Sequence, residues 1–123
     1  FVVNSFFAYG ESLIAGSDGG WWLPLLTQRR STQPPLNYGT EQGPFPDYRA
    51  WINQAPRVII EKGINHSETL ELLRGRGIGY AYIGQQQGRV NSPEPLLDLQ
   101  TLQSDPHFEL VYHQDRVWIF KIR

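Results

Sequence analysis

The chain contains no cysteine and no methionine, and its charges have no dominant sign, with eleven basic and twelve acidic side chains. Without cysteine, the protein forms no disulfide and offers no thiolate to a metal ion. No apolar run approaches the ~20 residues that a membrane-spanning helix needs. Nucleic-acid binding needs a concentrated positive field, so the composition argues against a nucleic-acid partner.

What is present fits one globular domain. The chain has 123 residues, of which 40% are hydrophobic, and this is enough to bury a sizeable core. Nine of the eleven cations are arginine, which suits planar contacts with carboxylates, phosphates and aromatic rings, although arginine-rich coding explains the bias equally well. The sequence opens inside the strand-like run FVVNS. We therefore predict that residues 1–123 form a single α/β domain cut from a longer protein.

The first half of the chain alternates apolar runs with glycine- and proline-rich segments. Its pattern predicts, in order, a strand over 1–7 ending near Asn4 or Ser5, a loop over 8–20, a short helix over 21–28 capped by Ser17 or Asp18, a second strand over 29–32, no regular structure over 33–46, and a helix over 47–55 ending before Pro56. Residues 57–60 are ambiguous between a strand and a helical turn.

The second half has clearer boundaries. Asn65 or Ser67 is expected to cap a helix that Gly77 ends, and an apolar strand follows over 78–84. A further helix is expected from Ser92 and Pro93 to near residue 105. Strands over 108–114 and 117–123 then form a hairpin. The last strand carries large apolar residues on both faces, which predicts cover on both sides.

This order of elements predicts an α/β fold, a three-layer sandwich with a mainly parallel sheet and a C-terminal antiparallel β-hairpin. In such sheets, ligands bind beyond the carboxyl ends of the parallel strands. The loops that follow the first strand and the 78–84 strand are expected to meet there if the two strands are neighbours. The predicted ligand-binding residues are Asn4, Ser5, Asp18, Gly19, Gly20, Gln85, Gln86, Gln87, Arg89 and Asn91.

Each loop has a functional interpretation and a structural one. The segment GSDGG could hold an anion on main-chain N–H groups, but its glycines also suit a tight strand-to-helix turn. The segment QQQGRVN offers amide and guanidinium donors, which suit sugars or sugar phosphates, and it is equally consistent with a solvated loop. Exposed aromatic residues such as Trp21, Trp22 or Tyr38 could stack on a sugar face.

Catalytic and metal-binding patterns are missing from the sequence. The three histidines, at positions 66, 107 and 113, have no metal-ligand spacing. There is no GxSxG motif and no close pair of carboxylates in a plausible cleft. The sequence thus predicts no catalytic residue, no metal site and no cofactor.

Four stretches together resemble a known class of protein: NSFFAYG, GGWWLPLLTQRRS, GIGYAYIG and DPHFELVYHQDRVWIFKI. They look like the soluble C-terminal domains of bacterial multi-pass membrane proteins of the glycosyltransferase type. Gln28 stands where that pattern often has glycine. The resemblance implies an accessory domain on the extracytoplasmic face of the membrane, with catalysis in the membrane portion of the parent chain and no catalytic residue here.

Two functional hypotheses follow. In the first, the chain is a non-catalytic accessory domain of a polytopic membrane protein, with a structural or glycan-contacting role; its partners are the membrane portion of its own parent chain and a glycan or lipid-linked sugar. In the second, it is a small independent enzyme or a nucleotide- or sugar-phosphate-binding domain that uses the 16–20 and 85–91 loops.

Overall fold

The structure, a computed structural model, describes residues 1–20, 22–34, 36–90 and 94–123. The strands are β1 (Val2–Val3), β2 (Ser5–Ala8), β3 (Leu13–Gly16), β4 (Tyr80–Ile83), β5 (Phe108–Gln114) and β6 (Val117–Ile122). The helices are α1 (Trp22–Thr27), the 3₁₀ helix η1 (Leu36–Gly39), α2 (Tyr48–Lys62), α3 (Ser67–Gly75) and α4 (Leu99–Ser104).

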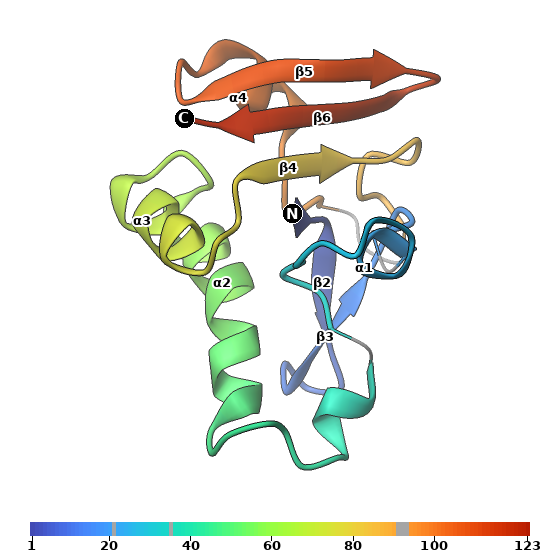
Figure 1. Cartoon of the computed structure of the whole chain (residues 1–123), viewed down its shortest axis with the longest axis vertical. Coiled ribbons are helices and arrows are strands. Elements are labelled where there is room, and N and C mark those ends of the chain that lie inside the picture. The colour runs from blue at the N-terminus through green and yellow to red at the C-terminus, as the bar shows by residue number, and fades with distance from the viewer. Residues whose placement is uncertain (21, 35, 91–93) are drawn as a thin grey trace.

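The main sheet has four strands in the order β1-β4-β6-β5, and only the β1–β4 pair is parallel (Figure 1). A separate two-stranded antiparallel sheet pairs β2 with β3. The fold is therefore a mixed α/β fold, and the prediction of a three-layer sandwich with a mainly parallel sheet is wrong. The C-terminal antiparallel hairpin, β5–β6, is present and is joined at the predicted turn.

The main reason for this difference is a break at Asn4 in the segment predicted as one strand. The main-chain oxygen of Asn4 accepts a hydrogen bond from the Ser17 N–H at 3.0 Å, and its side chain is buried. The chain before Asn4 joins the main sheet as β1, and the chain after it leaves as β2. The partner of β2 is β3, which lies in a segment expected to be a loop.

Residues 29–32, predicted as a strand, are not one. The segment still runs beside β1, because the Thr32 N–H donates to the Phe1 oxygen at 2.9 Å and the Thr32 hydroxyl accepts from the Val3 N–H at 3.3 Å. It thereby covers the free edge of β1. At the preceding turn, Gln28 has a φ of 54°, a conformation that glycine adopts most easily.

The helix predicted to end before Pro56 continues through that proline to Lys62 as α2, and residues 57–60 are helical. Ile52, Ala55 and Ile59 are buried along one stripe of α2. Burying this stripe favours continued helix in spite of the missing main-chain hydrogen bond at the proline. The prediction of a short helix is wrong because it considered only the hydrogen bond lost at Pro56 and not the burial of this stripe.

The helix caps are partly as predicted. Gly77, with a φ of 71°, follows the end of α3. The N-cap of α3 is His66, whose Nδ1 accepts from the Glu68 N–H at 3.3 Å, and not Asn65 or Ser67. Helix α4 begins later than expected, at an Asp98 cap whose carboxylate accepts from the Thr101 N–H at 2.8 Å. The predicted start at Ser92 and Pro93 lies outside the described residues.

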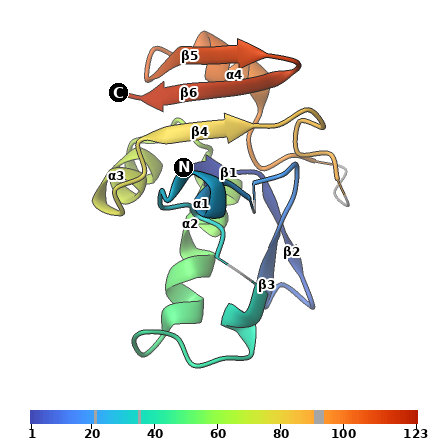
Figure 2. The same ribbon diagram turned by 45° about the vertical axis from the view of Figure 1, so that its right-hand side comes forward.

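Two hydrophobic cores hold the elements together. The main core lies between one face of the four-stranded sheet and helices α3, α4 and the C-terminal part of α2. The second core joins β3, η1 and the N-terminal part of α2, which extend below the main sheet (Figure 2). Ile59 belongs to the main core and Ile52 to the second. Helix α2 is thus common to both.

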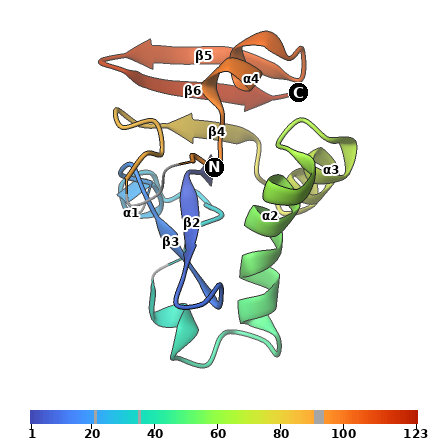
Figure 3. The same ribbon diagram turned by 180° about the vertical axis from the view of Figure 1, so that it is seen from behind.

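The last strand is covered on one face only. In β6, Trp118 and Phe120 are buried in the main core, whereas Val117 and Ile119 on the other face are half-buried. Helix α4 lies against one side of the β5–β6 hairpin, and in the described part of the chain no helix lies against the other (Figures 1 and 3). The prediction of cover on both sides is wrong, which is why the fold lacks a third layer.

The β5–β6 turn offers a test of the fold. Asp115 and Arg116 have φ values of 51° and 64°, as in a type I′ turn, where glycine is preferred at the second position. We expect Arg116→Gly to raise the free energy of unfolding by about 0.5–1 kcal/mol, measured by denaturant unfolding. Arg116→Ala should give no gain, since alanine keeps the strained φ. An equal gain from alanine would show that the charge, and not the backbone, is responsible.

Candidate functional site

The structure brings together the two loops that were predicted to form a site. Strands β1 and β4 are parallel neighbours, with Val2 opposite Ala81, so their carboxyl ends lie at one edge of the sheet. There the Asp18 carboxylate accepts hydrogen bonds from the Gln86 N–H at 2.7 Å and the Gly88 N–H at 2.9 Å. We call this contact between residues 16–20 and 84–88, with Asn4 beneath it, the loop junction.

The loop junction is closely packed. Asn4 is 1% exposed, and its Oδ1 accepts from the Leu97 N–H at 2.8 Å. A Cβ added to Gly88 would lie 2.5 Å from the Asn4 Cγ, and one added to Gly84 would lie 2.3 Å from the Asp18 main-chain oxygen. The Asp18 carboxylate therefore holds the two loops to each other, and Asn4 bonds to Ser17 and Leu97 beneath them.

Two more of the predicted ligand-binding residues, Gly20 and Ser5, are buried. Gly20 is buried, and a Cβ there would lie 2.8 Å from the Val3 Cβ. Ser5 is buried in β2, and its hydroxyl has no hydrogen-bond partner within the described residues. Of the remaining predicted residues, Gly19, Gln85, Gln86 and Arg89 are exposed and Gln87 is half-buried, while Asn91 lies outside the described residues. Ligand binding by these residues stays a prediction.

Two matched glycine variants test the loop junction. Gly88 and Gly10 both have positive φ, but a Cβ on Gly10 meets nothing within 4 Å. We expect Gly88→Ala to lower the free energy of unfolding by about 2–4 kcal/mol, because the methyl group overlaps Asn4 and the φ is strained. Gly10→Ala should lower it by only about 1 kcal/mol, the backbone cost alone. Equal losses in thermal or denaturant unfolding would show that the two loops are not packed as described.

A different cleft has the character of a binding site. It has a volume of about 360 Å³ and lies between the first turns of α2, the 29–34 segment and the end of α3. The residues that line it include the aromatic side chains Phe45, Tyr48 and Trp51, the cations Arg29, Arg30 and Arg76, and the amide Gln33. We call it the arginine–aromatic cleft.

Three aromatic rings form one wall of this cleft. The Tyr48 and Trp51 rings lie nearly parallel, with centroids 6.0 Å apart. The Phe45 ring meets both edge-on, at centroid distances of 5.2 Å from Tyr48 and 5.8 Å from Trp51. Such pairs hold the rings in fixed orientations. Trp51 is 42% exposed, so part of its ring remains open to a ligand.

Arg76 is the central cation of the cleft. Its guanidinium carbon lies 4.1 Å from the centroid of the Trp51 ring, and its Nη2 donates to the Gln54 Oε1 at 2.7 Å. Its Nε is buried and has no hydrogen-bond partner in the described part of the chain. Burial lowers the pKa of Arg76 from its usual value, which means that the site destabilises the unpaired charge.

The charge of the cleft has one sign. Arg30 lines the cleft together with Arg76, and its Nη1 is 3.9 Å from the position of a Cβ on Gly77. Among the described residues that line the cleft there are three arginines and no acidic residue. Gln33 adds an amide that is 2% exposed and whose Oε1 has no partner among the described residues. A guanidinium cluster without a carboxylate attracts an anion.

The sequence interpretation missed this cleft. In the sequence, Tyr48 and Trp51 have helical spacing and Arg76 lies at the expected end of the next helix, but no local pattern connects them. Tyr38, which was expected to be exposed for sugar stacking, is buried, and its hydroxyl donates to the Asn53 Oδ1 at 2.8 Å. The available signal was the ring cluster beside an arginine-rich segment, but 25 positions separate Trp51 from Arg76 in the sequence.

The histidines lie in three separate places. His66 caps α3, His107 Nδ1 lies 2.8 Å from the Asp105 carboxylate, and His113 stacks on Trp118 with ring centroids 4.6 Å apart. No group of three histidine or acidic side chains in the described ranges could hold a metal ion. None of the helices in these ranges has the length and hydropathy of a membrane span.

Comparisons of the chain with protein-family models, with curated proteins and with solved structures found no match. The resemblance to membrane proteins of the glycosyltransferase type therefore stays a prediction, and the functional argument depends on the cleft itself.

Proposed function

We propose that this chain is a non-catalytic binding module whose arginine–aromatic cleft takes a sugar phosphate, that is, an anionic group attached to a ring with an apolar face. The observation that carries the proposal is the Arg76 guanidinium, which stacks on Trp51 and keeps a buried Nε without a partner. An unsatisfied buried donor costs free energy, and an anionic oxygen of a ligand would remove that cost.

The other lining groups suit the rest of such a ligand. Arg30 also lines the cleft and adds a second cation to the positive field on a phosphate. The exposed part of Trp51 offers apolar surface beside the Arg76 guanidinium. Gln33 offers an amide oxygen to a hydroxyl group. Cations, rings and amides bind and orient a ligand, which favours recognition as the role of the cleft.

We extend the proposal to a longer parent protein of which this chain would be one domain. A module that recognises sugar phosphates fits an accessory domain on the extracytoplasmic face of a polytopic membrane protein of the glycosyltransferase type. There the ligand would be a glycan or a lipid-linked sugar, whose phosphate and ring match the two halves of the cleft. The membrane portion of the same parent chain would carry the catalysis.

Ligand binding can be tested with a small panel of probes. Glucose 1-phosphate, glucose and inorganic phosphate are titrated into the 15N-labelled protein, and amide shifts are followed by NMR. We expect saturable shifts at the cleft with glucose 1-phosphate and weaker ones with either half of the molecule, because the cation and the ring contribute together. Arg76→Gln should weaken binding about tenfold or more, since a charge-assisted hydrogen bond contributes ~1.5–3 kcal/mol.

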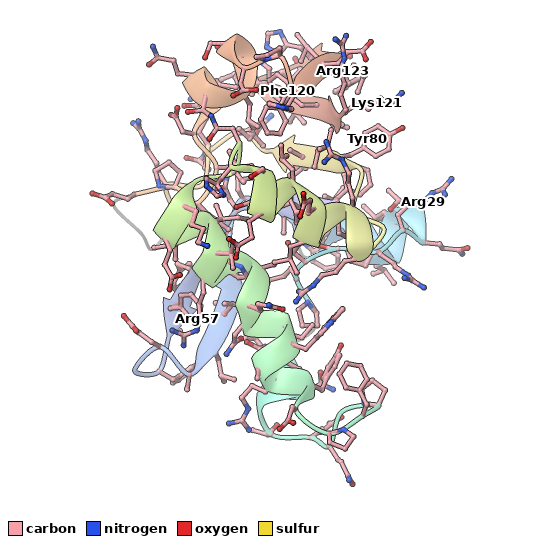
Figure 4. The ribbon with its side chains drawn as sticks, turned by 90° about the vertical axis from the view of Figure 1, so that its left-hand side faces the viewer. Arg29, Arg57, Tyr80, Phe120, Lys121 and Arg123 are labelled. Carbon is pink, nitrogen blue, oxygen red and sulfur yellow. The ribbon has the colours of Figure 1, made fainter. Side chains whose placement is uncertain are left out.

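The chain contains a matched control. Like Arg76, Arg57 on α2 lies over an aromatic ring, with its guanidinium carbon 4.7 Å from the Phe7 centroid. It lies outside the cleft, on the side of the molecule away from Arg29 (Figure 4). Arg57→Gln should leave the affinity unchanged. Equal weakening by both variants, or no saturable binding of any probe, would contradict the proposal, and preferential binding of a nucleotide would favour a nucleotide-binding domain.

A further inference from the structure

Helix α1 presents an apolar face to solvent. Trp22 is 61% exposed, Leu25 69% and Leu26 76%, and α1 contains no buried residue. These positions are spaced i, i+3 and i+4, so the three side chains lie on one face of the helix. The half-buried Leu23 and Pro24 lie on the side that meets the rest of the protein. Clustered apolar exposure of this kind marks an interaction surface.

Two cations adjoin this face. Arg29 and Arg30 follow α1 by two and three residues, and both are exposed. Neither forms an ion pair with a carboxylate in the described part of the chain. Figure 4 shows Arg29 projecting from the end of α1 away from the body of the molecule. We call Trp22, Leu25, Leu26 and the two arginines the α1 face.

We infer that the α1 face docks on the surface of an anionic lipid bilayer. Tryptophan and leucine side chains on one side of a short helix enter the boundary between headgroups and acyl chains, where the amphipathic indole is favoured. Arginines at the end of the helix reach the lipid phosphates and gain from the negative surface potential. Arg29 and Arg30 also line the cleft, but the inference is tested with lipid vesicles and no sugar phosphate, so its failure and that of the proposed function are distinguishable.

Charge favours a bilayer over a second copy of the chain. An isologous dimer built on the α1 face would bring Arg29 and Arg30 of one copy near those of the other, which is repulsive. An anionic surface complements the same cations. Three apolar side chains make a modest and reversible contact.

The absence of cysteine allows a site-specific test. A single cysteine is introduced by Leu26→Cys and labelled with an environment-sensitive dye. The matched control is Ile60→Cys, where the native side chain is 62% exposed; it belongs to α2, which lies on the other side of the molecule from α1 (Figures 1 and 3). Circular dichroism confirms that each labelled protein is folded. The probes are vesicles of equimolar phosphatidylglycerol and phosphatidylcholine, and vesicles of phosphatidylcholine alone.

We expect a blue shift of the dye at position 26 with the anionic vesicles, a much smaller shift with phosphatidylcholine, and none at position 60 with either. Adding Arg29→Gln and Arg30→Gln to the Leu26→Cys protein should weaken partitioning about tenfold or more, and added salt should act in the same direction.

Four results would overturn the inference. These are the absence of a shift at position 26, equal shifts with both kinds of vesicle, equal shifts at positions 26 and 60, and a shift at position 26 that grows with protein concentration without vesicles. The last result would assign the α1 face to self-association.

Discussion

Helix α2 runs through Pro56, and the arrangement of both cores depends on it. A proline inside a helix removes a main-chain hydrogen bond and costs about 3 kcal/mol. Ile52 is buried in the second core and Ile59 in the main core, and burying two such side chains contributes about 3–6 kcal/mol. The burial offsets the proline, so one helix of 15 residues joins the four-stranded sheet to the β2–β3 hairpin.

The same helix length positions the arginine–aromatic cleft. Helix α2 continues ~17 Å beyond Trp51, and α3 then crosses it (Figure 1), so the end of α3 lies beside Trp51. Arg76 is the residue at that end, and it lands on the indole ring. Arg76 is half-buried without a carboxylate partner among the described residues, so its desolvation is offset only by Gln54 and the Trp51 ring. Residues that break the rules of stable packing in this way are expected where a ligand supplies the missing partner.

The sequence predicted what local signals determine and failed where distant contacts decide. The glycine stop after α3, the strand that follows it and the C-terminal hairpin rest on neighbouring residues, and they are present. The break at Asn4 depends on Ser17 and Leu97, and the passage through Pro56 depends on two cores, so neither is visible in a local window. The meeting of the 16–20 and 84–88 loops followed from the parallel β1–β4 pair. The hydrogen bonds between these two loops could not be predicted in the same way, because a hydrogen-bond partner can be assigned only once the packing is known.

The helical spacing of apolar residues also does not determine whether their side chains are buried or exposed. The apolar positions of α1 and the rings at the start of α2 have the spacing of buried faces, yet Trp22 and Trp51 remain accessible in the fold. Arg29 and Arg30 lie between the two surfaces, since they line the cleft and also follow α1. A ligand phosphate in the cleft and a lipid phosphate beneath α1 would both be attracted to these two arginines. Each guanidinium carries several donors in one plane, so it can bind two phosphates. A sugar phosphate attached to a lipid could therefore occupy the cleft while its bilayer contacts the α1 face, whereas a free sugar phosphate would occupy the cleft alone.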